Sequence, residues 1–133
     1  MVIDTSALVA ILQREPERRR FIEVIEAADA RLISAATFVE ISIVIEARYG
    51  AEGLRDLDQF IGRAGIELVP VDAEHSSAAR VAFSRFGKGR HSAGLNFGDC
   101  FSYALALVVG QPLLFKGDDF VHTDVATVDL DAH

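Results

Sequence analysis

Carboxylates in apolar surroundings are the feature of this sequence most suggestive of chemistry. Asp4 directly follows a short apolar run, and Glu40 is the one charge in an otherwise apolar helical stretch. Asp99 lies near the start of another apolar segment, and the pair Asp118 and Asp119 follows an apolar run through a glycine. An ionised carboxylate in such surroundings is costly unless it is paired or bound to a cation. These acids therefore stand apart from the ordinary acids of a protein surface.

A divalent metal ion is the cation that this set of acids would bind. Several carboxylates converging on one crevice repel one another unless a cation lies among them. Oxygen ligands favour Mg²⁺ or Mn²⁺ over Zn²⁺. No Cys/His spacing typical of a zinc site is present, and the histidines are scattered at His75, His91, His122 and His133. The sequence therefore predicts a Mg²⁺ or Mn²⁺ site.

Each acid also has a purely structural interpretation. Asp4 could cap a helix, and Glu40 could pair with an arginine. Asp99 could simply favour the positive end of its helix, and Asp118 with Asp119 could form a plain turn. Each of these interpretations is credible alone, but all of them together are much less so.

Short apolar runs alternate with longer segments of helical periodicity along the chain. Strands are expected at Val2-Ile3, Arg31–Ser34, Ile66–Val71 and Leu113–Phe115, with a fifth near Ala126–Val128. Helices are expected from positions 4–6 to Leu12, from Pro16 to about Ala28, from Thr37 to Tyr49, over Ala51–Ala64, from Asp72 to Phe86, and over Asn96–Val109. Pro16 suits a first helical turn, and Gly50 and Gly65 suit helix ends.

This alternation predicts an α/β sandwich with a central parallel sheet of four to five strands. Strands that alternate with helices pair in parallel through right-handed crossovers. In such sheets the ligand crevice lies beyond the carboxyl ends of the strands. Asp4 follows the first expected strand, and Asp118 with Asp119 follows the fourth, so we expect these acids to meet at one edge.

The bulk composition favours one cytoplasmic domain spanning residues 1–133. The chain is of common single-domain length, and no apolar run approaches the ~20 residues of a membrane span. No basic leader precedes Asp4, and the lone Cys100 suits a reducing compartment. The formal charge of −7 argues against a general nucleic-acid coat protein. Acids that hold metal ions would still allow action on RNA.

The ordered motifs resemble those of PIN-domain nucleases, and their spacing is similar to the VapC toxin branch. The motifs are Val-Ile-Asp-Thr-Ser at the N-terminus, a glutamate in an early apolar helix, Asn-Phe-Gly-Asp-Cys, and Leu-Leu-Phe-Lys-Gly-Asp-Asp-Phe. The resemblance covers essentially the whole chain. The opening Asp-Thr-Ser is weak alone, but the ordered set is specific. The resemblance implies a PIN-like α/β/α sandwich.

The resemblance also assigns roles to individual residues. Asp4, Glu40 and Asp99 match the metal-binding acids of the family. The fourth acid is Asp119, directly before a phenylalanine, while the neighbouring Asp118 could substitute for it or assist it. The residues that match supporting positions are Thr5 or Ser6, as the small hydroxyl beside the first aspartate, and Asn96, one turn before Asp99.

The implied activity is Mg²⁺- or Mn²⁺-dependent hydrolysis of RNA phosphodiester bonds by an endoribonuclease toxin. Lys88 and Arg90, in a glycine-rich loop, are candidates for phosphate contacts, as is Lys116, although the loop could equally be a solvated one.

Family membership implies a homodimer and a cognate antitoxin that inserts a basic side chain at the acidic site. The apolar helix from Thr37 to Tyr49 suits a protein partner.

Three alternatives remain open. The chain could be a PIN nuclease acting in RNA maturation or decay without a toxin role. It could be a degenerate PIN fold that only binds, although retention of all the acids speaks against that. A phosphatase of the acidic α/β type also opens with an aspartate after its first strand. Such enzymes use an Asp-x-Asp motif, and here Ser6 takes the second position.

Overall fold

The computed structural model describes residues 1–131, so His133 lies outside the described part of the chain. Strands and helices alternate as the sequence predicts. In chain order they are β1 (Val2–Ile3), α1 (Thr5–Leu12), α2 (Arg18–Ala27), β2 (Leu32–Ser34), α3 (Ala35–Ala64), β3 (Glu67–Val69), α4 (Ala73–Phe86), α5 (Phe97–Val109) and β4 (Leu113–Leu114).

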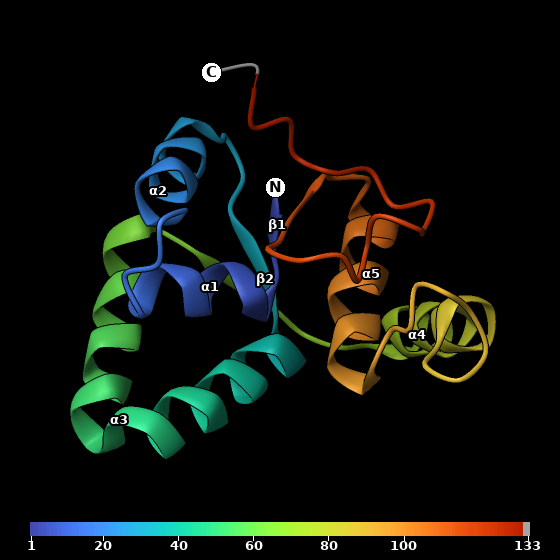
Figure 1. The fold of residues 1–133 in the computed structure, drawn as a ribbon, viewed down its shortest axis with the longest axis horizontal. Helices are drawn as coiled ribbons and strands as arrows, with labels where there is room; N and C mark the ends of the chain where they lie inside the picture. The colour runs from blue at the N-terminus through green and yellow to red at the C-terminus, as the bar shows by residue number, and fades with distance from the viewer. Residues whose placement is uncertain (132–133) are drawn as a thin grey trace.

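A four-stranded parallel sheet forms the middle of the molecule, in the order β3-β2-β1-β4. Helices α1, α2 and α3 lie on one side of it, and α4 and α5 lie on the other (Figure 1). The predicted α/β sandwich is thus confirmed. Only a single parallel bridge, between Leu113 and Thr127, forms where a fifth strand was expected.

Strands β1 and β4 are apolar on both faces because both faces are covered by helices. Ile3 and Leu114 belong to the core beneath α1, α2 and α3. Their strand neighbours Val2 and Leu113 belong to the core beneath α4 and α5. All four side chains are at most 1% exposed. This double burial fixes the strand register, and with it the positions of the residues that follow β1 and β4.

Two boundaries differ from those expected. The second helix begins at Arg18 rather than at Pro16. Arg14 has a left-handed backbone conformation, with a φ of 55°, and Pro16 lies in the turn that follows. The Arg18 N–H closes this turn by donating to the Glu15 carbonyl (3.0 Å). The third strand is confined to Glu67–Val69. No helix within residues 1–131 combines the length and apolarity needed to span a bilayer.

The helices expected on either side of Gly50 form one kinked element, α3. Gly50 has φ 67° and ψ −154°, a backbone conformation essentially restricted to glycine. Gly53 lies at the inside of the kink, where an added Cβ would lie 2.7 Å from Tyr49 Cβ and 2.8 Å from Ile45 Cγ2. The two glycines therefore allow α3 to bend around α1.

Replacing Gly50 by alanine is expected to destabilise the protein by roughly 1–3 kcal/mol, because a side chain is strained in that conformation. The matched control is Gly62→Ala, at a helical position with open space around the added methyl. That control should be neutral or stabilising by about 1 kcal/mol at most, since alanine is the better helix former. Urea unfolding of both variants checks the prediction, and equal stabilities would contradict it.

Candidate active site

Asp4 lies at the carboxyl end of β1 and is 3% exposed. It is the N-cap of α1, and its Oδ2 accepts hydrogen bonds from the Ser6 backbone N–H (3.0 Å) and the Ser6 hydroxyl (2.7 Å). The structural interpretation of Asp4 as a helix cap is therefore correct. It accounts for only one of the two carboxylate oxygens.

The other oxygen of Asp4 is held from α5. The buried Ser102 hydroxyl donates to Asp4 Oδ1 at 2.6 Å, across 98 residues of sequence. The Ser102 hydroxyl also lies 3.2 Å from the hydroxyl of Thr37 in α3, and both side chains are at most 1% exposed. Sequence reasoning missed Ser102 and Thr37, because a serine or threonine inside a helix gives no signal of a distant partner.

Asp99 lies in the first turn of α5 and is 7% exposed. It forms a capping box with Asn96: the Asp99 N–H donates to Asn96 Oδ1 (2.8 Å), and the Asn96 N–H donates to Asp99 Oδ2 (3.0 Å). These bonds place Asn96 directly beside Asp99 and restrict the rotation of its carboxylate. Ser102 lies one turn further along α5, so the same helix presents Asp99 and holds Asp4.

Burial raises the pKa of both aspartates. At Asp4 this rise is opposed by the hydrogen bonds from Ser102 and Ser6. Burial raises the pKa of Asp99 to about 8, and the nearby charges of Asp4 and Asp119 contribute to the rise. The Cys100 thiol has a pKa of about 11 through burial and the charge of Asp99, which makes it a neutral group rather than a nucleophile.

Glu40 approaches the same region from α3. Its Oε1 accepts a hydrogen bond from the Thr5 hydroxyl at 2.5 Å. Its carboxylate also lies against Gly98, where an added Cβ would be 1.9 Å from Glu40 Oε2. The glycine before Asp99 is therefore what leaves room for Glu40, a role that the sequence alone did not reveal.

The two aspartates after β4 differ in their surroundings. Both are exposed, but Asp119 lies close enough to Asp99 for its charge to raise the pKa of that carboxyl. The backbone carbonyl of Asp118 accepts a hydrogen bond from the Val121 N–H (3.4 Å), which closes the turn. Asp119 thus lies near Asp99, whereas Asp118 contributes its backbone carbonyl to the turn.

The three basic candidates differ in their surroundings. Lys88 and Arg90 are exposed in the loop after α4, which is tied at its base by the bond from the Lys88 N–H to the Leu95 carbonyl (2.8 Å). Lys116 instead pairs with Glu15 and with Glu17 (3.2 Å). Its ammonium group is therefore engaged by the segment between α1 and α2.

The donor chemistry and charge of these acids fit a hard divalent cation. None of the ion pairs formed by residues 1–131 reaches Asp4, Glu40, Asp99 or Asp119. Over the same residues, no three His, Cys, Asp or Glu side chains are arranged as a ready-made metal cluster. The raised pKa of Asp99 shows that neighbouring carboxylates act on it, and a bound cation would favour the charged form of all of them.

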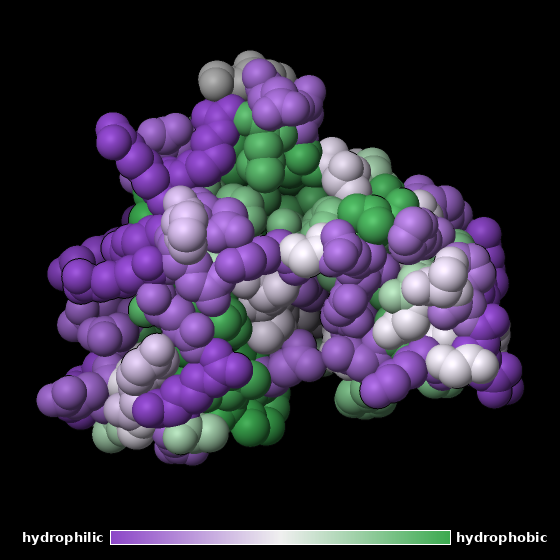
Figure 2. Space-filling model, in the orientation of Figure 1, coloured by the Kyte–Doolittle hydropathy of each residue, from purple (hydrophilic) through white to green (hydrophobic). Residues whose placement is uncertain are grey.

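An exposed apolar face borders the acids. Phe97, which is 78% exposed, lies two residues before Asp99, and Ile43 on α3 is 64% exposed. Both line a groove that also includes Glu40 and Gly98. Phe97 and Phe101 pack edge to face, with ring centroids 4.9 Å apart. Figure 2 shows hydrophilic residues over most of the face it draws, with hydrophobic patches beside the N-terminus and along α3.

Comparison with known proteins identifies the family. The PIN-domain profile matches residues 1–126. The chain is 58% identical over 130 residues to ribonuclease VapC30 of Mycobacterium tuberculosis, covering 98% of this chain and 99% of that protein. It is 57% identical over 128 residues to ribonuclease VapC of Mycolicibacterium smegmatis, covering 96% and 99% respectively.

Solved structures share the fold at much lower identity. Mycobacterium tuberculosis VapC20, a toxin that cleaves the sarcin–ricin loop, aligns with a TM-score of 0.76 at 15% identity, covering 96% of this chain and 97% of that one. VapBC2 of Rickettsia felis, bound to a promoter DNA fragment, aligns with a TM-score of 0.76 at 12% identity, covering 96% of each chain. The chain therefore belongs to the PIN-domain family, in its branch of VapC ribonucleases.

Proposed function

We propose that this VapC-type ribonuclease hydrolyses RNA with Mg²⁺ or Mn²⁺ held at Asp4 and Asp99, and acts as the toxin of a toxin–antitoxin pair. The observation that supports it best is the burial of these two carboxylates close together with no basic side chain paired to either. Glu40 and Asp119 complete the acidic set at its edge.

Bound there, a divalent ion would supply Lewis-acid stabilisation of the scissile phosphate and activation of a water. Ser6 and Ser102 fix both oxygens of Asp4, so that carboxylate has little freedom to turn away. The capping box orients Asp99, and Thr5 orients Glu40. Asp119 is the exposed member of the set, so it is the acid most accessible to an RNA chain.

The protein partners follow from family membership and from the apolar face. We propose that a cognate antitoxin covers part of this face and inserts a basic side chain among the acids, which no cation of the chain itself neutralises within residues 1–131. A homodimer, also proposed from the resemblance, would cover further apolar surface around Ile43 and Phe97.

Loss of one metal-binding carboxylate tests the proposed function directly. Asp4→Asn and Asp99→Asn should each reduce RNA cleavage by more than about 100-fold, since even a group one step removed from a metal ion costs 10–100-fold. In a bacterial host, the wild type should arrest growth with discrete RNA fragments, and the variants should not.

The matched control is Asp58→Asn, an identical change at an exposed acid on α3. It should behave as the wild type. If wild type and Asp99→Asn grow equally, and purified wild type leaves RNA uncut with either metal ion, the chain is a binding module. Cleavage without growth arrest would instead favour a nuclease of RNA maturation or decay.

Metal-free protein should lose stability as the pH rises. Because the pKa of Asp99 is raised from 3.8 to about 8 in the folded state, the folded state binds more protons than the unfolded state between these values. The free energy of unfolding therefore falls across that pH window. The stabilisation by added Mg²⁺ should grow over the same window, because the metal ion competes with the proton. Urea unfolding from pH 5 to 8, with chelator or with Mg²⁺, measures both trends, and Asp99→Asn should flatten them.

Lys88 and Arg90 should contribute to RNA affinity rather than to the chemical step. In an Asp99→Asn background that does not cleave, Lys88→Ala and Arg90→Ala should each weaken binding to single-stranded RNA. Removing one phosphate-binding side chain should lower the slope of log affinity against log salt by about 0.7. Fluorescence anisotropy at several salt concentrations measures it. Arg48→Ala in the same background, at an exposed arginine on α3, is the control. If Lys88→Ala and Arg90→Ala both keep the slope of the Asp99→Asn parent, the loop does not contact phosphate.

A further inference from the structure

The segment that carries Asp119 has little regular structure to hold it. Between β4 and residue 125 it forms turns and bends, and Asp118 and Asp119 are both exposed. Its near end is fixed by the Lys116 N–H, which donates to the Ser6 hydroxyl at 3.0 Å. Its middle is fixed by Phe120, which is 1% exposed and packs edge to face on Phe115 with ring centroids 5.2 Å apart.

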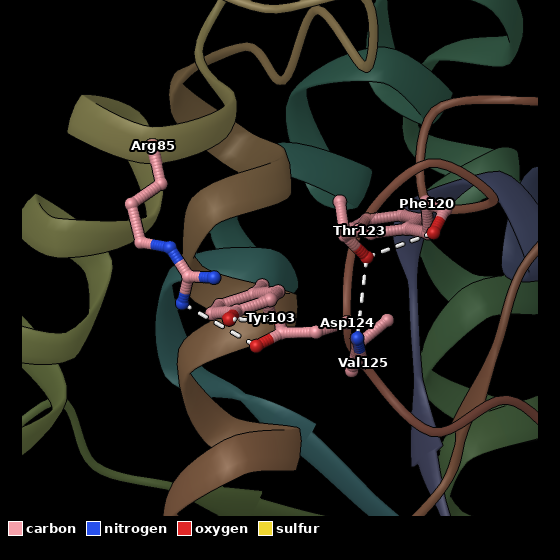
Figure 3. Close-up of polar contacts among 6 residues, drawn as sticks. All are labelled: Arg85, Tyr103, Phe120, Thr123, Asp124 and Val125. Atoms are coloured by element: carbon pink, nitrogen blue, oxygen red, sulfur yellow. Dashed lines mark hydrogen bonds and ion pairs between the residues drawn. The ribbon is translucent and has the colours of Figure 1, made fainter.

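The far end of the segment is fixed by Asp124, which both α4 and α5 engage (Figure 3). The Tyr103 hydroxyl donates to Asp124 Oδ1 at 2.5 Å. Arg85 Nη1 lies 3.3 Å from Asp124 Oδ2. Tyr103 is 2% exposed, whereas the Arg85 and Asp124 side chains are about half exposed, at 53% and 51%. The buried phenol is therefore the directional contact, and the screened ion pair adds little.

Thr123 transmits the position of Asp124 back towards Asp119. Its hydroxyl donates to the Phe120 carbonyl (2.8 Å) and accepts from the Val125 N–H (3.3 Å), so the turn from Phe120 to Val125 is closed on both sides of Asp124 (Figure 3). A displacement of Asp124 would therefore reach Phe120, the immediate neighbour of Asp119.

Tyr103 lies one helical turn after Asp99 on α5. The same rigid helix thus presents Asp99 and anchors the segment that brings Asp119 to it. The Tyr103 ring also packs against Phe86 at 5.8 Å, and Phe86 in turn contacts Arg85 at 4.6 Å and His91 at 5.1 Å. Ring contacts with Phe86, which lies directly before the Lys88–Arg90 loop, therefore also restrict the position of Tyr103.

We propose that Tyr103, Asp124 and Arg85 form a latch that positions Asp119 against Asp99. These three are positioning residues, and they do not touch metal or RNA. The role at the metal site rests on the proposed function, whereas the hold on the segment does not.

The test compares Tyr103→Phe with Tyr49→Phe, the same chemical change at a half-exposed tyrosine on α3. Hydrogen exchange of amides 117–124 in metal-free protein is the first readout, and Mn²⁺ affinity by electron paramagnetic resonance is the second. For Tyr103→Phe we expect exchange about tenfold faster in this segment and a several-fold weaker Mn²⁺ affinity, as loss of one hydrogen bond to a charged group predicts. Exchange within α5, and all values for Tyr49→Phe, should be unchanged.

Asp124→Asn serves as the conservative variant, because its amide oxygen can still accept from the Tyr103 hydroxyl. It should retain most of the wild-type protection, while Asp124→Ala should reproduce Tyr103→Phe. Unchanged exchange and affinity in Tyr103→Phe would overturn the latch. So would faster exchange spread evenly through α4 and α5 with a lower melting temperature, which would indicate a merely structural contact. If the wild type binds no Mn²⁺, the metal site fails, and the exchange data still decide whether the latch holds the segment.

Discussion

The burial of two carboxylates side by side is the constraint on which the rest of the site depends. Burial and the charge of Asp4 both raise the pKa of Asp99, so the pair resists carrying two negative charges. Hydrogen bonds to charged groups contribute about 1.5–3 kcal/mol each. The three bonds to Asp4 from Ser6 and Ser102 favour its charged form and therefore offset part of the cost of its burial. These bonds hold Asp4 in place, but they supply no positive charge to neutralise the carboxylates. The site is therefore suited to a cation from outside the chain.

Local sequence signals predicted the parts of the structure that depend on local interactions. The position of Asp4 after β1, the support of Asp99 by Asn96 and the end of α3 at Gly65 are all visible as short patterns, and the structure agrees with each. The parallel pairing of the strands was also predicted, because strands that alternate with helices pair in parallel through right-handed crossovers. The acids were found because a charge within an apolar run is conspicuous.

Interactions across long stretches of sequence could not be predicted in this way. Ser102 and Thr37 read as ordinary helical residues, and only the packing of α5 against α3 and β1 makes them partners of Asp4. The kink at Gly50 was missed for another reason: a glycine that ends a helix and a glycine that bends one look alike in the sequence. Lys116 seemed suited to phosphate because it adjoins two aspartates, but the fold brings Glu15 and Glu17 to it.

The four acids come from four separate parts of the chain, so their mutual geometry cannot be set by any one of them. Asp4 is fixed by the register of β1, and Asp99 and Glu40 are carried on α5 and α3. Asp119 alone lies on irregular chain, where the backbone offers no ladder of hydrogen bonds to define its position. Hydrogen bonds of this segment with Ser6 at one end and with Tyr103 at the other fix its position. They replace the regular backbone bonds that position the other three acids. Because Asp119 is also the exposed acid, the firmness of these anchors decides how closely the fourth carboxylate stays against the buried pair.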